Sequence, residues 1–355
     1  MTATATPAYA ELLARTHFSF HHGASAPEEL VDRALALGYQ ALAITDDCSV
    51  AGVVAAHAHL NSLAKDGAPP LQLIPGAVFT LPAPVGPAMP GVPSAQGQAG
   101  IAGEGAAQEG ALPGWRLVVL PRHLVGWGQL CRAITRFRAA APKGQYRASW
   151  PVPGSGTFSG CELVLLPPRA GWWQWRDSEK RAIGQRISSG KAIFDCENGG
   201  LWLGVALHSQ LDDDGWLMHL HQWAATSGLP LVAVGDVVMH SRSRKPLRDV
   251  LTSIRLGQPL AQCGAALQPH AQAHLRSRPH LLAAYPPHVL AATAELASRC
   301  HFSLNELRYR YPREAVGEGE TPTQTLARRC GRARRGGMAP AFPPASTARS
   351  RTNSP

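Results

Sequence analysis

The sequence predicts an α/β protein in which short buried strands alternate with helices, arranged either as a barrel or as a mostly parallel sheet. Three apolar runs support this prediction, because each of them ends abruptly in polar residues. The runs are residues 41–45, 203–207 and 231–234, and the residues that follow them are Asp46, Asp47, His208 and Asp236. Enzymes built on α/β barrels place catalytic groups at the C-terminal ends of strands, so the pattern favours a metal-dependent hydrolase.

Local signals assign the elements of the N-terminal part. Residues 11–15 are expected to form the first strand. Ser25 and Glu28 have the spacing of a capping box, Pro27 is tolerated in a first helical turn, and Gly38 stops the helix that follows. The next expected elements are a strand at 39–44, a helix at 53–64 and a strand at 71–81 that Pro75 and Gly76 interrupt.

The later part of the chain continues the alternation. Strands are expected at residues 117–120, 161–166, 201–207 and 231–234, and helices at 128–137, 216–227, 246–256 and 288–300. Trp172, Trp173 and Trp175 crowd one turn, and such aromatic clusters usually pack in a core. Strands that alternate with helices imply a mostly parallel sheet or barrel.

Composition excludes several classes of protein. The chain has 355 residues, 45% of them hydrophobic, which is enough for one large domain or two medium ones. No apolar run is long enough to cross a bilayer and the N-terminus lacks a secretory pattern, so we expect a cytoplasmic protein without a membrane partner. The seven cysteines occur singly, which argues against a disulfide framework and against a cysteine zinc site.

Two segments lack the apolar residues that a core needs. Residues 82–114 are mainly Ala, Gly, Pro, Gln and Ser, and we expect a disordered insertion there. Residues 328–355 contain seven arginines and no acidic residue, and removing those seven charges lowers the net charge from +10 to +3. The pattern therefore favours a nearly neutral domain with a disordered basic tail over a wholly basic surface for nucleic acid.

Several segments, taken together, resemble one family. They are YAEL at residues 9–12, FSF at 18–20, GAS at 23–25, AITD at 43–46, GWGQLCRAIT at 126–135, RKPLRDVLTSIRLG at 244–257 and CHFSLNELRY at 300–309. These segments resemble the N-terminal region of bacterial C-family DNA polymerases, above all the error-prone, damage-inducible branch used in translesion synthesis. The resemblance covers residues 9–327 apart from the insertion.

The resemblance implies a fold, a domain organisation and a metal site. That N-terminal region is a polymerase-and-histidinol-phosphatase (PHP) domain, a distorted seven-stranded β/α barrel. The domains implied are the barrel at residues 9–257, the start of the polymerase's helical region at 258–327 and the disordered basic tail at 328–355. Active PHP domains bind Zn²⁺ or Mn²⁺ through His, Asp and Glu at strand C-termini, and they hydrolyse phosphoesters or proofread.

This chain departs from the family's ligand pattern. Positions that the resemblance assigns to metal ligands hold Leu13, Arg15, Val78 and Val238, and the fourth-strand histidine falls near Arg116. An arginine cannot ligate a metal and repels one. The vestigial candidates that remain are His22, Asp46, Asp47, His208 and Asp236. The sequence predicts no catalytic residue and no cofactor in this chain alone, and it leaves the identity of any metal unknown.

Structural alternatives for these candidates stay open. Asp46 is the kind of residue that caps a helix after a strand, and His208 can be a hydrogen-bonded residue of the barrel rim. His21 and His22 are adjacent, so in an extended segment they point to opposite sides and cannot both bind one metal.

The polymerase chemistry of the family requires three acidic residues of a palm domain that hold two Mg²⁺ ions, and no strand-borne acids of this kind follow residue 257. We therefore expect a truncated N-terminal part of an error-prone DNA-directed DNA polymerase, a nucleotidyltransferase of DNA replication and DNA damage repair, that is inactive alone. The resemblance implies DNA and other translesion or replication proteins as partners of the full-length protein.

The change of composition after residue 328 favours a frameshift over a native basic tail. Two other functions stay open. The chain could act as a stand-alone metal-dependent PHP phosphoesterase, or as a nucleic-acid-binding remnant that uses its arginine tail.

Overall fold

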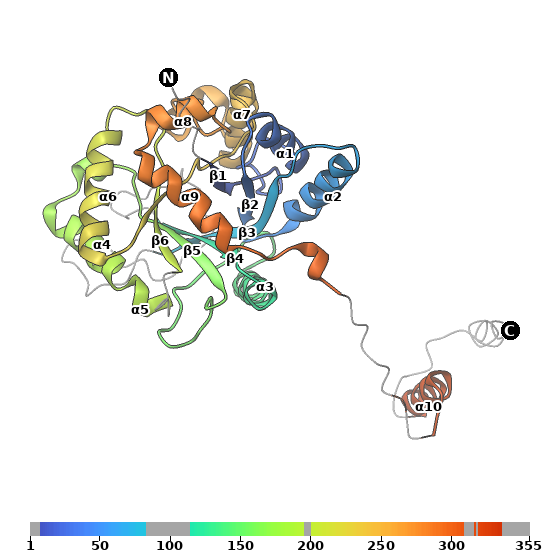
Figure 1. The fold of residues 1–355 in the computed structure, drawn as a ribbon. Helices are drawn as coiled ribbons and strands as arrows, with labels where there is room; N and C mark the ends of the chain where they lie inside the picture. Colours follow the sequence, from blue (N-terminus) through green and yellow to red (C-terminus); the bar gives the residue numbers. More distant parts are fainter. Residues whose placement is uncertain (1–7, 83–113, 195–199, 309–315, 317–318, 336–355) are drawn as a thin grey trace. The chain divides into compact units, whose positions relative to one another are not determined.

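The computed structural model describes residues 8–82, 114–194, 200–308, 316 and 319–335 (Figure 1). The chain divides into two compact units, Met1–Leu307 and Arg308–Pro355. The expected insertion at 82–114 lies outside the described residues except for its two ends, and so does the tail after residue 335.

Seven strands form one sheet in the order of the sequence. They are β1 (Ala10–Ala14), β2 (Ala41–Asp47), β3 (Gln72–Leu81), β4 (Trp115–Pro121), β5 (Cys161–Leu166), β6 (Leu201–Val205) and β7 (Leu231–Ala233). All neighbours run parallel except β4, which is antiparallel to both β3 and β5. The sheet nearly closes, because Val237, which follows β7, exchanges backbone hydrogen bonds of 2.9 Å with Leu13 of β1 and with Arg15 just after it. The predicted seven-stranded α/β barrel is thus confirmed.

Nine helices of the first unit surround the strands in the part of the chain that the structure describes (Figure 1). They are α1 (Pro27–Ala36), α2 (Ala51–Lys65), α3 (Leu124–Ala139), α4 (Asp177–Ser188), α5 (Gly190–Phe194), α6 (Asp213–Ser227), α7 (Lys245–Leu256), α8 (Arg278–Ala284) and α9 (Pro287–Arg299). Short 3-10 turns occupy Trp172–Gln174, Arg242–Arg244, Leu260–Gln262, Gly264–Ala266 and Leu304–Glu306. None of the described helices is long and apolar enough to cross a membrane.

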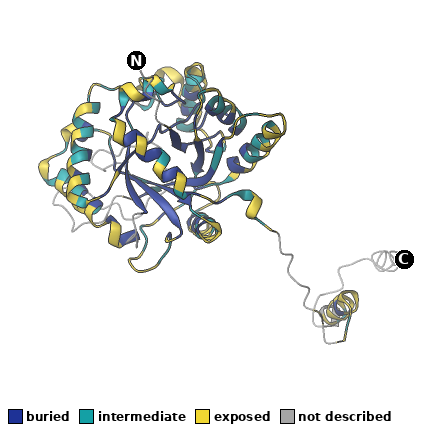
Figure 2. Ribbon diagram, viewed as in Figure 1, coloured by how far each residue is buried: buried dark blue, intermediate teal, exposed yellow. Residues whose placement is uncertain are grey.

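The core has two main layers, because successive strand residues point to opposite faces of a sheet. Leu117 and Val119 of β4 pack in the larger apolar cluster with the outer helices. Val118 and Leu120 belong to a second cluster that also contains Leu296 of α9. Figure 2 shows the result: the strands are mostly buried, while the helices expose one side. Residues 278–299 therefore pack in the same unit as the barrel.

Three predictions for the elements were wrong in detail. Pro75 and Gly76 do not interrupt β3, which pairs with β2 without a break; Gly76 is needed there because a Cβ atom would lie 2.6 Å from the Leu120 side chain. Helices α4, α5 and α8 were not expected. The second unit contains α10 (Pro322–Arg335), so a helix continues to residue 335 where the sequence predicted disorder from 328.

The aromatic cluster between β5 and α4 is a packing cluster, as predicted, for two of its three tryptophans. The rings of Trp172 and Trp175 lie 5.8 and 6.3 Å from that of Trp216 on α6. Trp173, in contrast, is 60% exposed.

Candidate functional site

Polar and charged residues gather at one end of the barrel, where the parallel strands finish. Arg15 follows β1, Asp46 and Asp47 end β2, and Asp236 follows β7 with a left-handed backbone (φ 48°). Because β4 runs in the opposite direction, its second residue, Arg116, lies at this same end and pairs with Thr80 and Leu166 at the ends of β3 and β5.

The centre of the site is one carboxylate held between two guanidinium groups. Arg15 Nη2 donates to Oδ1 of Asp236 at 2.9 Å, and Arg116 Nη1 donates to the same oxygen at 2.6 Å. The side chains of Arg15 and Asp236 are 6% and 8% exposed. Burial opposes the ionisation of Asp236, but the charges of Arg116 and Arg15 outweigh it and hold the pKa of Asp236 well below its ordinary value.

A second arm of the site joins β2 to the loop after β1. Arg15 Nη1 also lies 3.9 Å from Oδ2 of Asp47. Burial lowers the pKa of His22 to about 4, with Arg15 among the charges that add to this effect and Asp47 opposing it. Among the described residues, buried Nδ1 of His22 has no hydrogen-bond partner.

Asp46 is a clamp on the loop after β1. Its carboxylate accepts hydrogen bonds from the backbone N–H of Thr16 at 2.7 Å, from the Thr16 hydroxyl and from the Ser19 hydroxyl at 2.7 Å. Burial raises the pKa of Asp46, and these donors oppose the rise. The alternative that Asp46 caps α2 is wrong, since the cap residue is Val50 and it makes no side-chain capping bond. Asp46 is thus fully engaged in holding the chain.

His208 also makes structural contacts. Its Nε2 donates to the carbonyl oxygen of Gly235 at 3.2 Å, and its ring stacks on that of His270 with centroids 5.1 Å apart. Burial lowers the pKa of His208 to about 4, which keeps the imidazole neutral near pH 7. The histidine is therefore a hydrogen-bonded residue of the rim.

The donor set does not fit a divalent metal. Among the described residues, no group of three or more His, Cys, Asp and Glu converges as metal ligands would. Arg15 and Arg116 place their positive charges against Asp236, where a metal would need negative oxygen. Leu13, Val78 and Val238, the apolar replacements, are all buried.

Sequence reasoning missed Glu11, a buried acid in β1. Its Oε1 accepts from the backbone N–H groups of Leu13 at 3.0 Å and Gly235 at 2.8 Å, and its Oε2 accepts from the Tyr9 hydroxyl. Burial raises the pKa of Glu11, against these hydrogen bonds. The signal was present as a single acid inside an apolar strand, which is a rare place for a carboxylate.

A second buried network joins residues 276–285 to the barrel, and the sequence offered no local sign of it. Arg276 donates to the carbonyl oxygen of Leu207 at 3.0 Å and to the Tyr285 hydroxyl at 2.9 Å. The Tyr285 hydroxyl in turn donates to the carbonyl oxygen of Val234 at 2.9 Å. These bonds hold α8 and its flanking residues against the ends of β6 and β7.

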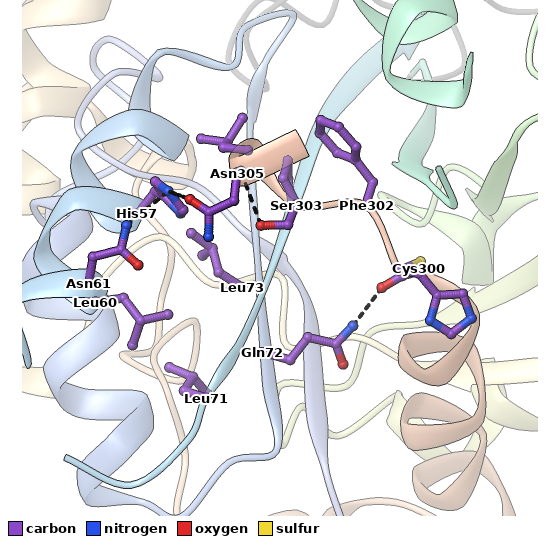
Figure 3. A pocket seen from close by; sticks show the side chains of 13 residues that line it. His57, Leu60, Asn61, Leu71, Gln72, Leu73, Cys300, Phe302, Ser303 and Asn305 are labelled. Carbon is purple, nitrogen blue, oxygen red and sulfur yellow. Dashed lines mark hydrogen bonds between the residues drawn. The ribbon is translucent and has the colours of Figure 1, made fainter. Parts of the chain in front are cut away.

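A pocket among the described residues lies away from the site around Asp236. It has a volume of about 360 Å³ and is lined by α2, the start of β3 and residues 300–305. Figure 3 shows Gln72 reaching the carbonyl oxygen of Cys300 (2.6 Å) and His57 facing Asn305 (3.1 Å). Gln72 begins β3, so this pocket lies at the opposite end of the strands from Asp46 and Asp47. Its polar groups bind one another, which favours a structural contact.

Comparisons with known proteins found a family match for part of the barrel and relatives that align with about nine tenths of the chain. Residues 11–151 match the PHP domain family. An error-prone DNA polymerase of Azoarcus sp. (strain BH72) is 40% identical over 336 residues, covering 91% of this chain and 28% of that protein. An error-prone DNA polymerase of Ralstonia nicotianae is 40% identical over 334 residues, covering 90% and 27%. The chain therefore spans just over a quarter of the length of these relatives.

Among solved structures, an amidohydrolase from Chromobacterium violaceum is similar over 65% of this chain and 88% of that one. The sequence identity is 16% and the TM-score is 0.38, so this likeness says nothing about the site.

Proposed function

We propose that this chain, which contains a PHP domain and resembles the N-terminal region of error-prone DNA polymerases, acts as the non-catalytic N-terminal part of such a polymerase. The observation that supports the loss of catalysis is the ion cluster of Arg15, Asp236 and Arg116 at the strand ends. The guanidinium groups of Arg15 and Arg116 surround Asp236, the residue that the resemblance assigns to the metal site on the last strand.

The same cluster suggests what the domain does instead. Arg15 and Asp236 flank the place where the first and last strands meet, and Arg116 adds the fourth strand. A buried ion pair contributes little net stability, but it specifies which groups meet. We infer that the cluster fixes the closure of a barrel that serves as a scaffold.

The rest of the polymerase would supply the chemistry. In this proposal residues 9–257 are the scaffold, residues 258–327 begin the helical region of the polymerase and residues 328–355 are a tail. DNA would be the substrate of the whole protein in replication and in translesion synthesis after damage, and its partners would be other proteins of those pathways. The polymerase is expected in the cytoplasm.

Primer extension tests the proposal at two levels. The isolated chain should extend no primer. A chimera in which residues 8–307 replace the matched region of the Azoarcus polymerase should extend one, since the scaffold would be restored to its catalytic part. Robust synthesis by the isolated chain, or an inactive chimera that is folded, would contradict the proposal.

Metal analysis separates this proposal from a stand-alone phosphoesterase. After incubation with Zn²⁺ or Mn²⁺ and removal of free metal, mass spectrometry should find far less than one equivalent per chain. Stoichiometric metal that disappears in Asp236→Ala would favour the phosphoesterase instead. A useful control is Asp214→Ala, which removes a carboxylate in the first turn of α6.

A further inference from the structure

Helix α7 exposes several apolar residues and buries two polar ones. Three of its apolar residues, Leu247, Val250 and Ile254, are 40%, 45% and 57% exposed, whereas Leu251 packs against the buried cluster around Val238 and Met239. Its polar residues Arg248 and Thr252 are only 4% and 1% exposed. An amphipathic helix on the surface of a soluble domain normally buries its apolar side.

Three of the exposed residues form one stripe along the helix. Positions 247, 250 and 254 are three and four residues apart, so their side chains lie on one face of the helix. Gly257 ends the helix in a left-handed conformation (φ 63°), and Leu260 just beyond it is 45% exposed. Isolated apolar residues on a surface are ordinary, but a stripe of this kind marks a contact site.

The polar residues of α7 and of the turn before it make hydrogen bonds and ion pairs. Arg248 and Thr252 are hydrogen-bonded to each other, and the charges of Arg255 and Arg248 contribute to the lowered pKa of His22 in the charged site. At the start of the helix Arg244 pairs with Glu29 of α1, and Figure 1 shows α7 beside α1. Arg248 and Thr252 thus lie on the buried side of α7, and Leu247, Val250 and Ile254 lie on its exposed side.

We propose that this stripe, formed by Leu247, Val250, Ile254 and Leu260, is the surface on which the polymerase part of the full-length protein docks. The inference rests on the proposed function. About three quarters of the length of the Azoarcus and Ralstonia relatives lies outside the matched region. The corresponding part of the full-length protein is the partner that would cover the stripe. A second copy of this chain is the competing occupant, and the concentration dependence of labelling distinguishes it.

Cysteine labelling tests the docking directly. Ile254→Cys is introduced into the isolated chain and into the Azoarcus chimera described above, and the rate of maleimide labelling of its peptide is followed by mass spectrometry. The rate should be at least ten times lower in the chimera. The matched control is Val54→Cys on α2, which is 64% exposed and should label at the same rate in both proteins.

Equal rates at position 254 in a chimera that extends primers would overturn the docking and leave the proposed function intact. Protection that develops in the isolated chain as its concentration rises would also overturn it, in favour of a second copy. Slow labelling in a folded chimera that extends no primer would support the docking and count against the proposed function alone.

Discussion

Arg15 Nη2 lies 2.9 Å from Oδ1 of Asp236, and this ion pair connects the end of the first strand to the turn after the last one. The two residues are 221 positions apart in the sequence. Backbone hydrogen bonds of Val237 with Leu13 and Arg15 lie beside the pair. A buried ion pair thus lies beside the closure of the barrel, at the C-terminal ends of its parallel strands.

Removal of one partner of the Arg15–Asp236 ion pair should destabilise the barrel. Arg15→Ala leaves the buried Asp236 with Arg116 alone, and breaking a buried pair typically costs about 3–5 kcal/mol. We expect a loss near the lower limit, since Arg116 remains, measured as the free energy of unfolding in urea. Lys143→Ala, at an exposed position, should change it by less than about 0.5 kcal/mol. An equally small change for Arg15→Ala would show that the barrel does not depend on the Arg15–Asp236 ion pair.

The buried neutral His208 should make the fold sensitive to mild acid. The pKa of His208 is about 4 in the fold against an ordinary 6.5, so the unfolded chain gains a proton first as pH falls. Stability from this residue is full above pH 6.5 and is lost between about pH 6.5 and 4. At pH 5 the loss is roughly 2 kcal/mol, at about 1.4 kcal/mol for each unit of pKa.

The variant His208→Gln tests this by removing the titrating group while it keeps a donor for Gly235. Its stability should fall less than that of the unchanged chain between pH 7 and pH 5, as measured by urea unfolding at each pH. Identical pH profiles would rule out His208 as the source of the acid sensitivity.

Glu11 should have the opposite dependence. Burial raises its pKa above the ordinary value of 4.5, so the folded chain holds this proton more tightly. The contribution of Glu11 is therefore largest below about pH 4.5 and is lost as pH rises through its folded pKa. In Glu11→Gln the loss is absent, so the difference in stability between variant and parent should grow in favour of the variant from pH 4 to 7. A difference that is constant with pH would show that folding does not shift the pKa of Glu11.

A glycine pair tests the Asp46 clamp. A Cβ atom at Gly52 of α2 would lie 2.4 Å from Oδ2 of Asp46 and 2.7 Å from the Thr16 hydroxyl. Gly52→Ala should therefore destabilise the domain by about 1–3 kcal/mol, although alanine favours helices. Gly128→Ala in α3 meets nothing within 4 Å and should stabilise it by about 0.5–1 kcal/mol. Thermal unfolding of both variants measures the contrast, and a stabilised Gly52→Ala would mean that the clamp yields easily.

The sequence patterns determined the α/β class, as a barrel or a mostly parallel sheet, and the approximate place of most elements; the resemblance to the family implied the barrel. Short apolar runs that end in Asp46 and Asp236, with helical periodicity between them, depend only on neighbours in the chain. The resemblance to the family assigns metal ligands to positions 13, 15, 78 and 238, and the side chains found there cannot bind a metal.

Tertiary structure alone decided how these residues are used. Asp46 proved to be a clamp on Thr16 and not a helix cap, since its donors come from a loop 30 residues away. Arg116 reaches Asp236 because β4 runs antiparallel, and strand direction is set by pairing with β3 and β5. In α7 the structure buries Arg248 and Thr252 and exposes Leu247, Val250 and Ile254. Helical periodicity cannot reveal this, because it shows two faces without saying which one is buried.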